Sequence, residues 1–264
     1  MDLGIQGRVA IVGGASRGMG KAIAQGLAAE GVRVAMCART QSALEEAANE
    51  VINSNSQEQV IAVAADLSSK DGPKHLFETV MNHWGTVDIL VNNVGGPPPG
   101  KPSEHDDEAW SAAFELNFFS VVRMVRQVLP GMRDKSWGRI VNLLSIAVKE
   151  PVEGLVLSTA SRMGAVGYAK MLADEIGPMG ITVNNVLPGF VLTDRLRFLA
   201  ETRAKAAGTT ADEILLKMAE PAAARRIGRP DEMADLVSFL VSERAAYITG
   251  TSIVLDGGAS HSTF

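Results

Sequence analysis

Short apolar runs recur along this chain and alternate with longer segments that mix apolar and polar residues. Seven runs rich in Val, Ile, Ala and Leu show no polar alternation, at 9–12, 32–37, 60–64, 89–91, 140–144, 182–187 and 252–255. Strands that are buried on both faces of a parallel sheet have this pattern. The longer segments that could form helices crossing back over the sheet include 20–29, 42–53, 107–128 and 159–175. The pattern predicts a Rossmann-like, doubly wound α/β fold with about seven parallel strands and helices on both faces.

One segment departs from this alternation. Residues 193–224 are mostly helical in character and carry Gly208, Thr209 and Thr210 near their middle. An insertion of this length in an α/β fold is often an active-site lid, and we interpret 193–224 as a lid over a substrate pocket. No repeat or low-complexity linker divides the rest, so we interpret 1–264 as a single domain.

Composition narrows the classes of function. Hydrophobic residues make up 46% of the 264 residues and charged residues 21%, which is typical of a globular domain. The net charge of −5 without a basic cluster argues against a nucleic-acid or membrane partner. Cys37 is the single cysteine, no apolar run is long enough to span a bilayer, and no spacing suggests a metal site. We therefore expect a cytoplasmic protein with a small-molecule substrate.

A glycine-rich stretch, 13–20, follows the first apolar run and leads into a helical segment. Gly14 can take a tight turn, Gly18 lets the backbone approach a pyrophosphate, and Gly20 lets helix and strand pack closely. The start of a helix also favours negative charge. This context predicts a nucleotide-binding turn rather than a simple connecting loop.

The Gly-x-x-x-Gly-x-Gly spacing resembles the short-chain dehydrogenase/reductase family, and further motifs follow in the family's order. These are Asp66-Leu67, Asn92-Asn93-Val94-Gly95, Asn117, Ser145, Pro188-Gly189 with Thr193, Gly228-Arg229-Pro230, Tyr247-Ile248-Thr249-Gly250 and Asp256-Gly257-Gly258. The C-terminal motifs are most similar to those of the branch that contains 3-oxoacyl-acyl-carrier-protein reductases. The resemblance covers nearly the whole chain and implies a nicotinamide cofactor and a carbonyl or alcohol substrate.

Two arginines bear on the choice of cofactor. NAD-binding members usually place an acid after the second strand, whereas this chain has Arg39 there and Arg17 in the glycine-rich turn. Two guanidiniums suit a 2′-phosphate, so NADP(H) is preferred over NAD(H). The alternative is that Arg39 is a solvated loop cation and Arg17 only caps the helix. The resemblance implies that the cofactor is held by Gly14, Ser16, Arg17, Gly18, Met19, Gly20, Arg39, Asp66, Leu67, Asn93, Gly95, Arg162, Pro188, Gly189, Val191 and Thr193.

The reacting end of the site departs from the family pattern. Ser145 matches the serine that polarises the carbonyl, and Asn117 matches the asparagine that supports a proton-relay water. The family's tyrosine and lysine positions hold Ser158 and Arg162 in this chain. Tyr168 cannot replace the tyrosine, because ten helical positions beyond Ser158 it faces elsewhere.

This departure limits what the resemblance implies about activity. A serine hydroxyl is a much weaker acid than a phenol, and loss of a positioned acid typically costs about 10²- to 10⁴-fold in rate. Arg162 can donate to the cofactor ribose but is a poor tuner of an acid. The segment 146–157 offers Lys149, Glu150 and Glu153 as relocated donors, or simply as a solvated loop face.

Three functions remain open. The first is an NADPH-dependent reductase of a 3-oxoacyl-thioester-like substrate or cyclic ketone with an atypical proton donor. The second is an NADP(H)-binding protein without turnover, and the third is a non-redox lyase or isomerase. The resemblance also implies a homo-oligomer, a tetramer or dimer, built through the helices at 107–128 and 159–175 and the C-terminal segment.

Overall fold

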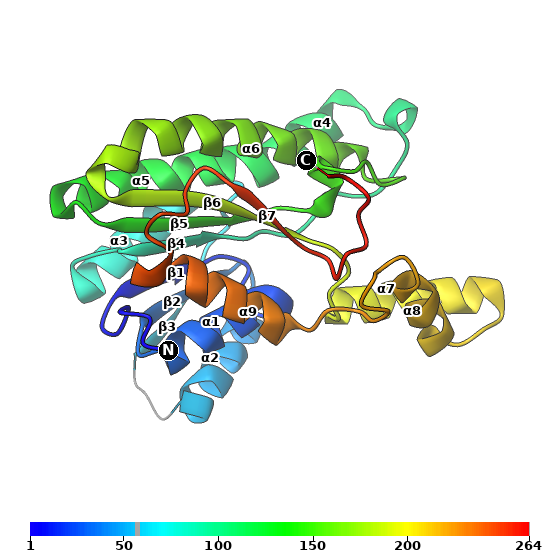
Figure 1. Ribbon diagram of the computed structural model, residues 1–264, viewed down its shortest axis with the longest axis horizontal. Helices are drawn as coiled ribbons and strands as arrows, with labels where there is room; N and C mark the ends of the chain where they lie inside the picture. Colours follow the sequence, from blue (N-terminus) through cyan, green and yellow to red (C-terminus); the bar gives the residue numbers. More distant parts are fainter. Residues whose placement is uncertain (56–58, 264) are drawn as a thin grey trace.

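A computed structural model of the chain describes residues 1–55 and 59–263. Seven parallel strands form one sheet in the order β3-β2-β1-β4-β5-β6-β7 (Figure 1). The strands are β1 (Val9–Val12), β2 (Arg33–Ala38), β3 (Val60–Ala64), β4 (Ile89–Asn92), β5 (Gly138–Leu143), β6 (Ile181–Pro188) and β7 (Ser252–Leu255). The predicted doubly wound parallel sheet is therefore confirmed. The order reverses between β1 and β4, which is where ligands bind in sheets of this kind.

Helices cover both faces of the sheet. One face carries α1 (Gly18–Ala29), α2 (Gln41–Asn55) and α9 (Pro230–Leu240), and the other carries α3 (Gly72–Trp84), α5 (Ser120–Lys135) and α6 (Val156–Ile176). In Figure 1 the first group lies below the sheet, with α5 and α6 above it. The short 3₁₀ turns are Pro102–Glu104, Ile146–Val148, Gly177–Met179 and Glu243–Ala245.

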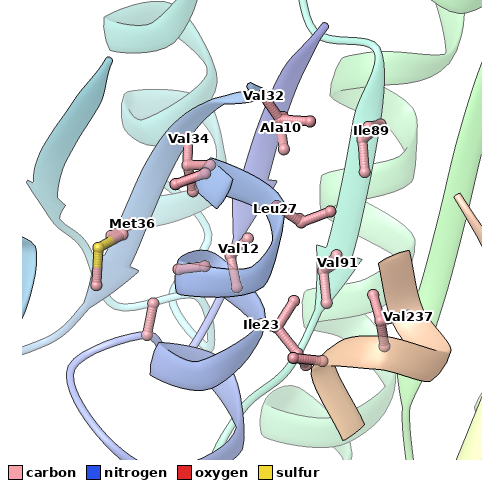
Figure 2. Close-up of a cluster of buried hydrophobic side chains, with 14 of the residues drawn as sticks. Ala10, Val12, Ile23, Leu27, Val32, Val34, Met36, Ile89, Val91 and Val237 are labelled. Carbon is pink, nitrogen blue, oxygen red and sulfur yellow. The ribbon is translucent and has the colours of Figure 1, made fainter. Parts of the chain in front are cut away.

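Each central strand contributes to two cores. In β1, Ala10 and Val12 pack with Ile23 and Leu27 of α1 (Figure 2), whereas the alternate residues of the strand belong to the opposite core. Successive side chains of a strand point to opposite faces, and here helices cover both. This double burial explains why the strands appear in the sequence as mostly apolar runs without polar alternation.

The helix expected at 107–128 differs from the expectation in two ways. It consists of α4 (Asp107–Phe114), a π-helical turn (Glu115–Phe119) and α5, and it continues through Pro130 to Lys135. Pro130 removes one backbone hydrogen bond, but the buried side chains of Val128 and Met132 hold the helix against the sheet on either side. The π turn carries one extra residue per turn and is frequent at functional sites.

The insertion at 193–224 is helical, as predicted. It contains α7 (Asp194–Ala207) and α8 (Ala211–Ala219), which form a pair beside the sheet (Figure 1). Gly208 ends α7 with a φ of 65°, and the Thr210 side chain accepts a hydrogen bond from the Glu213 amide to begin α8. The glycine and threonine noted in the sequence are thus the two helix boundaries.

Buried amides link four strands across the middle of the sheet. Asn92 donates to Asn142 at 2.8 Å, Asn142 donates to Asn185 at 2.9 Å, and Asn185 donates to Ser252 at 3.1 Å. These residues are paired directly in the strand register, so each side-chain N–H group finds an acceptor on the neighbouring strand. No helix among residues 1–55 and 59–263 is long and apolar enough to cross a membrane.

Candidate active site

A cleft of about 610 Å³ lies at the carboxyl ends of the strands. It is bordered by the segments that follow β1 to β6 and by the start of α7. The residues expected from sequence that line it are Gly14, Ser16, Arg17, Gly18, Met19, Gly20, Arg39, Asp66, Leu67, Asn93, Gly95, Ser145, Ser158, Arg162, Pro188, Gly189 and Thr193. Val191 is instead buried in the core beneath α1, and Asn117 lies behind the cleft.

The turn after β1 needs its glycines. Gly14 and Gly18 have φ values of 57° and 58°, in the left-handed region that favours glycine. A Cβ at Gly20 would overlap the Gly14 carbonyl oxygen and stand 2.8 Å from Asn93 Nδ2. The turn therefore folds back tightly on the start of α1, which presents its backbone N–H groups to the cleft.

Asn93 fixes this turn from the neighbouring strand. Its Nδ2 donates to the Gly13 carbonyl oxygen at 3.0 Å and lies 3.5 Å from that of Gly14. The resemblance implied that Asn93 holds the cofactor, and in the structure its side chain joins the segments after β1 and β4. The two segments that meet at the reversal of strand order are thus held together by one amide.

The outer end of the cleft carries two exposed cations, Arg17 and Arg39. Among the described residues, neither has a carboxylate within ion-pair distance. Burial raises the pKa of the nearby Cys37 thiol to about 12, and the charge of Asp66 adds to this effect. Asp66 accepts from the Ser68 amide at 3.0 Å and its hydroxyl at 2.7 Å, so one carboxylate oxygen is already engaged.

The inner end brings Ser145, Ser158 and Arg162 to one wall. Ser145 Oγ accepts from the Ala147 amide at 3.1 Å, which begins the 3₁₀ turn after β5. On α6, Arg162 Nε donates to Ser158 Oγ at 3.2 Å, and Nη1 donates to the Leu143 carbonyl oxygen at 3.0 Å. The spacing of four residues places Ser158 and Arg162 on one helix face. Both hydroxyls accept protein hydrogen bonds, so their protons are free to point into the cleft.

Arg162 is a buried cation. It is 6% exposed, and burial lowers its pKa from 12.5 to about 10, with repulsion from Arg195 as the second cause. No carboxylate among the described residues lies within ion-pair distance of Arg162. A desolvated cation of this kind favours any anion that reaches it.

Behind the cleft, the π turn places Asn117 against α6. Asn117 Nδ2 donates to Ser161 Oγ at 2.9 Å, whereas its Oδ1 is buried with no partner among the described residues. A cavity of about 10 Å³ is bounded by Asn117, Arg162 and Asn92 together with apolar side chains. This is room for about one water molecule.

Several residues considered from sequence lie away from the cleft. Lys149, Glu150 and Glu153 do not line it, and Glu150 Oε2 accepts from the His261 amide at 2.9 Å. Tyr168 packs edge-on against Phe118 with ring centroids 6.3 Å apart. Neither it nor the other tyrosine of the chain, at 247, borders the cleft. Among the described residues, the cleft lining contains no lysine or phenol, and its only carboxylates are Asp66 and Asp194.

Arg195 lines the cleft but was not expected there from the sequence. Its guanidinium extends from the first turn of α7 across the cleft mouth, with Nη1 and Nη2 placed 3.0 and 3.3 Å from where a Cβ of Gly96 would stand. Its position two residues after Thr193 was the only signal in the sequence. No group of three or more possible metal ligands is found among residues 1–55 and 59–263.

Comparison with known proteins places this geometry in a family. A family model described as short chain dehydrogenase matches residues 8–204. The chain is 34% identical over 256 residues to the 3-oxoacyl-acyl-carrier-protein reductase of Vibrio cholerae, covering 97% of this chain and 98% of that protein. The corresponding reductase of Escherichia coli K12 is also 34% identical over 256 residues, with the same coverage.

Solved structures agree with this assignment. The crystal structure of L-sorbose reductase from Gluconobacter frateurii, complexed with NADPH and L-sorbose, superposes with a TM-score of 0.96 at 34% identity and covers 99% of this chain and 100% of that one. A variant of actinorhodin polyketide ketoreductase with NADPH gives 0.90 at 33% identity, with coverage of 97% and 98%. The chain belongs to the short-chain dehydrogenase/reductase family.

Proposed function

We propose that this chain is an NADPH-dependent reductase of a ketone, with Ser158 as the proton donor. The carrying observation is the shared wall of Ser145, Ser158 and Arg162 at the inner end of a cleft that fits a dinucleotide. Its relatives include 3-oxoacyl-acyl-carrier-protein reductases and an L-sorbose reductase solved with NADPH, which supports ketone reduction as the reaction class.

The residues present fit NADPH. A cleft of about 610 Å³ is in the range of small-molecule and cofactor sites. The backbone N–H groups at the start of α1 suit the pyrophosphate, and Arg17 and Arg39 suit a 2′-phosphate. Further contacts are assigned to residues that line the path: Gly14, Ser16, Gly18, Met19, Gly20, Asp66, Leu67, Asn93, Gly95, Arg162, Pro188, Gly189 and Thr193. Because the side chain of Val191 is buried, only its backbone could contact the carboxamide of the nicotinamide ring.

NADPH, when bound, supplies a hydride, which adds two electrons and one hydrogen to the carbonyl carbon. Ser145 Oγ accepts from the Ala147 amide, which leaves the hydroxyl proton of Ser145 free to donate. Ser145 donates this proton in a hydrogen bond to the substrate carbonyl oxygen and so polarises the carbonyl. Ser158 gives its proton to the same oxygen, which becomes the product hydroxyl. The Nε–H of Arg162 stabilises the charge left on Ser158 Oγ. A serine releases this proton only as charge develops on the substrate oxygen, so we expect slow proton transfer.

The small cavity offers a way to return the proton. A water in it would donate to the unpartnered Asn117 Oδ1 and lie beside Arg162. The cavity and the cleft share Arg162 and Leu143 in their walls. Asn117 therefore acts as a positioning residue for water, and Ser158 regains its proton from solvent through this route or through the open cleft.

Two features around the cleft complete the proposal. The helical pair α7 and α8 within 193–224 acts as a lid, since Thr193, Asp194 and Arg195 at its root border the cleft. The chain forms a homo-oligomer through the helices at 107–128 and 159–175 and the C-terminal segment, which is supported by the exposed Phe119 of the π turn and Met163 and Met171 of α6. Analytical ultracentrifugation tests the second statement, and a monomer at micromolar concentration contradicts it.

The test of function is NADPH oxidation, followed at 340 nm with purified protein and a panel of 3-oxo thioesters, cyclic ketones, ketoses and oxo acids. Ser145→Ala and Ser158→Ala should each lower kcat by about 10²- to 10⁴-fold. Thr159→Ala is the matched control, because the next residue on α6 does not line the cleft. Loss of activity in Ser158→Ala with retained NADPH binding supports the assigned role.

Other outcomes reject the proposal. Tight NADPH binding with no oxidation across the panel indicates a binding protein without turnover. Substrate conversion without a change in NADPH absorbance indicates a non-redox lyase or isomerase. Unchanged kcat in Ser158→Ala removes Ser158 as the donor while leaving the reductase assignment intact.

A further inference from the structure

Among the described residues, two arginines that line the cleft have no acidic partner. Arg162 lies on α6 beneath the cleft and Arg195 lies on α7 at its mouth, and both line the same space. Among the described residues, no carboxylate lies within 4.0 Å of either guanidinium. Both side chains line one cleft, and repulsion from Arg195 is the second cause of the lowered pKa of Arg162, after burial.

The two carboxylates that line the cleft do not neutralise this pair. Asp66 belongs to the outer end, where it raises the pKa of Cys37 and accepts from Ser68. Asp194 begins α7 and makes no ion pair among the described residues. The lining thus carries four arginines, at 17, 39, 162 and 195, against two aspartates. This excess of positive charge in the cleft lining favours the binding of an anion.

Donor geometry at Arg162 fits such a ligand. A guanidinium has five N–H groups. Nε donates to Ser158 and Nη1 to Leu143, and Nη2 has no acceptor among the described residues. Arg195 reaches the cleft because Gly96 has no side chain at the place where its guanidinium lies. Planar, multiply donating groups of this kind recognise carboxylates and phosphates.

The position favours the substrate over the cofactor as the source of the anion. The cofactor phosphates are assigned to the start of α1 and to Arg17 and Arg39, away from the reacting wall. Arg162 shares the reacting wall with Ser145 and Ser158. An anion that meets both Arg162 and Arg195 therefore lies close to the carbonyl that is reduced.

We propose that Arg162 and Arg195 form an anion subsite and that the substrate is an oxo acid whose carboxylate lies a few bonds from its carbonyl. This inference rests on the proposed reductase function and narrows its substrate class. The hydride and the Ser158 proton convert the oxo acid to a hydroxy acid, and the carboxylate is unchanged. A carboxylate beside the carbonyl also draws electrons from the carbonyl carbon. Its contacts with the two arginines stabilise the complex of enzyme and substrate before the reaction.

The first experiment compares 2-oxo and 3-oxo acids with their primary amides as substrates for NADPH oxidation. The wild-type protein should prefer the acid by about 10- to 100-fold in kcat/KM, the range expected for charge-assisted hydrogen bonds. Arg195→Gln should reduce this preference at least tenfold, and Arg195→Lys should restore part of it. Arg197→Gln is the matched control, because Arg197 lies on the same helix but does not line the cleft.

A second measurement separates the subsite from turnover. Oxamate, an unreactive isostere of a 2-oxo acid, is titrated into the NADP⁺ complex of wild type, Arg195→Gln and Arg197→Gln by calorimetry. Binding that is lost only in Arg195→Gln supports the subsite even where no substrate is reduced, so the proposed function can fail alone. Equal turnover of acids and amides with no oxamate binding overturns the subsite while the reductase stands. Arg195→Gln that weakens NADPH binding but keeps the acid preference assigns Arg195 to the cofactor phosphates and also overturns it.

Discussion

Gly20 is the position in the cleft where a single methyl group should do most harm. An ideal Cβ there overlaps the Gly14 carbonyl oxygen and stands 2.8 Å from Asn93 Nδ2. Both neighbours are fixed, since one is backbone and the other donates to the Gly13 carbonyl oxygen. Gly20→Ala must therefore move the turn that presents the helix start to NADPH.

Gly20 lies in a helix, where alanine is normally stabilising, and this effect opposes the clash. The sign of the change in the free energy of unfolding therefore shows which of the two is larger. Alanine in place of glycine inside a helix stabilises by about 0.5 to 1 kcal/mol. Overpacking in a tight site costs about 1 to 3 kcal/mol. The clash should win, for a net loss of roughly 0.5 to 2 kcal/mol. NADPH affinity should fall at least tenfold, equivalent to about 1.4 kcal/mol, because the backbone N–H groups of the shifted turn no longer point at the pyrophosphate.

Gly131 on α5 provides the matched control. It is helical and exposed, and a Cβ there meets no atom within 4 Å. Gly131→Ala should raise Tm by about 2 to 4 °C, as expected for a gain near 1 kcal/mol. Thermal unfolding and NADPH titration by fluorescence measure both variants. Should Gly20→Ala gain stability as Gly131→Ala does and keep its NADPH affinity, the close contact with Gly14 is not present.

Three further predictions concern the cleft and the sheet. Arg39→Ala should reduce the preference for NADPH over NADH by about 10- to 100-fold in Kd, and an unchanged ratio makes Arg39 a solvated loop cation. The folded-state pKa of Cys37 is raised to about 12, so its thiol should not react with Ellman's reagent at pH 8 unless the protein is unfolded. The unfolded thiol ionises above its ordinary pKa of 9.0, whereas the folded thiol stays protonated until about pH 12. Cys37 should therefore contribute stability that is lost as pH rises from 9 to about 12, and Cys37→Ala should flatten this decline. Asn142→Ala leaves Asn92 and Asn185 without their hydrogen-bond partners and should lower the free energy of unfolding in urea by about 2 to 4 kcal/mol. A loss below about 1 kcal/mol means that Asn92 and Asn185 find other hydrogen-bond partners.

The strands were predictable because burial on both faces favours apolar residues at successive positions, without the alternation of a half-buried strand. The turn at 13–20 was predictable for a related reason, since positive φ at Gly14 and Gly18 restricts the residue type strongly. In both cases a local constraint acts on every residue of the segment. The fold class was therefore predictable from sequence, as was the glycine-rich turn that borders the cleft.

The inner end depends on contacts that local patterns do not encode. The π turn at Asn117 is set by packing against Ser161, which lies 44 residues away in the chain. The reach of Arg195 depends on the space above Gly96, which is 99 positions earlier in the sequence. The amide chain through Asn142 needs the exact pairing of four strands. Each of these follows from the assembled sheet rather than from any one segment.

Ser158 and Arg162 are best understood as one unit. The planar guanidinium donates through Nε to Ser158 and through Nη1 to Leu143, which fixes its direction from two sides. A lysine at this position has a single ammonium and cannot hold both acceptors in that fixed geometry. In the proposed role as proton donor, Ser158 is a weak acid whose developing negative charge is stabilised by the Arg162 Nε–H. Because each residue depends on the other in this way, exchanging one alone should disturb the site more than the sum of their separate contacts suggests.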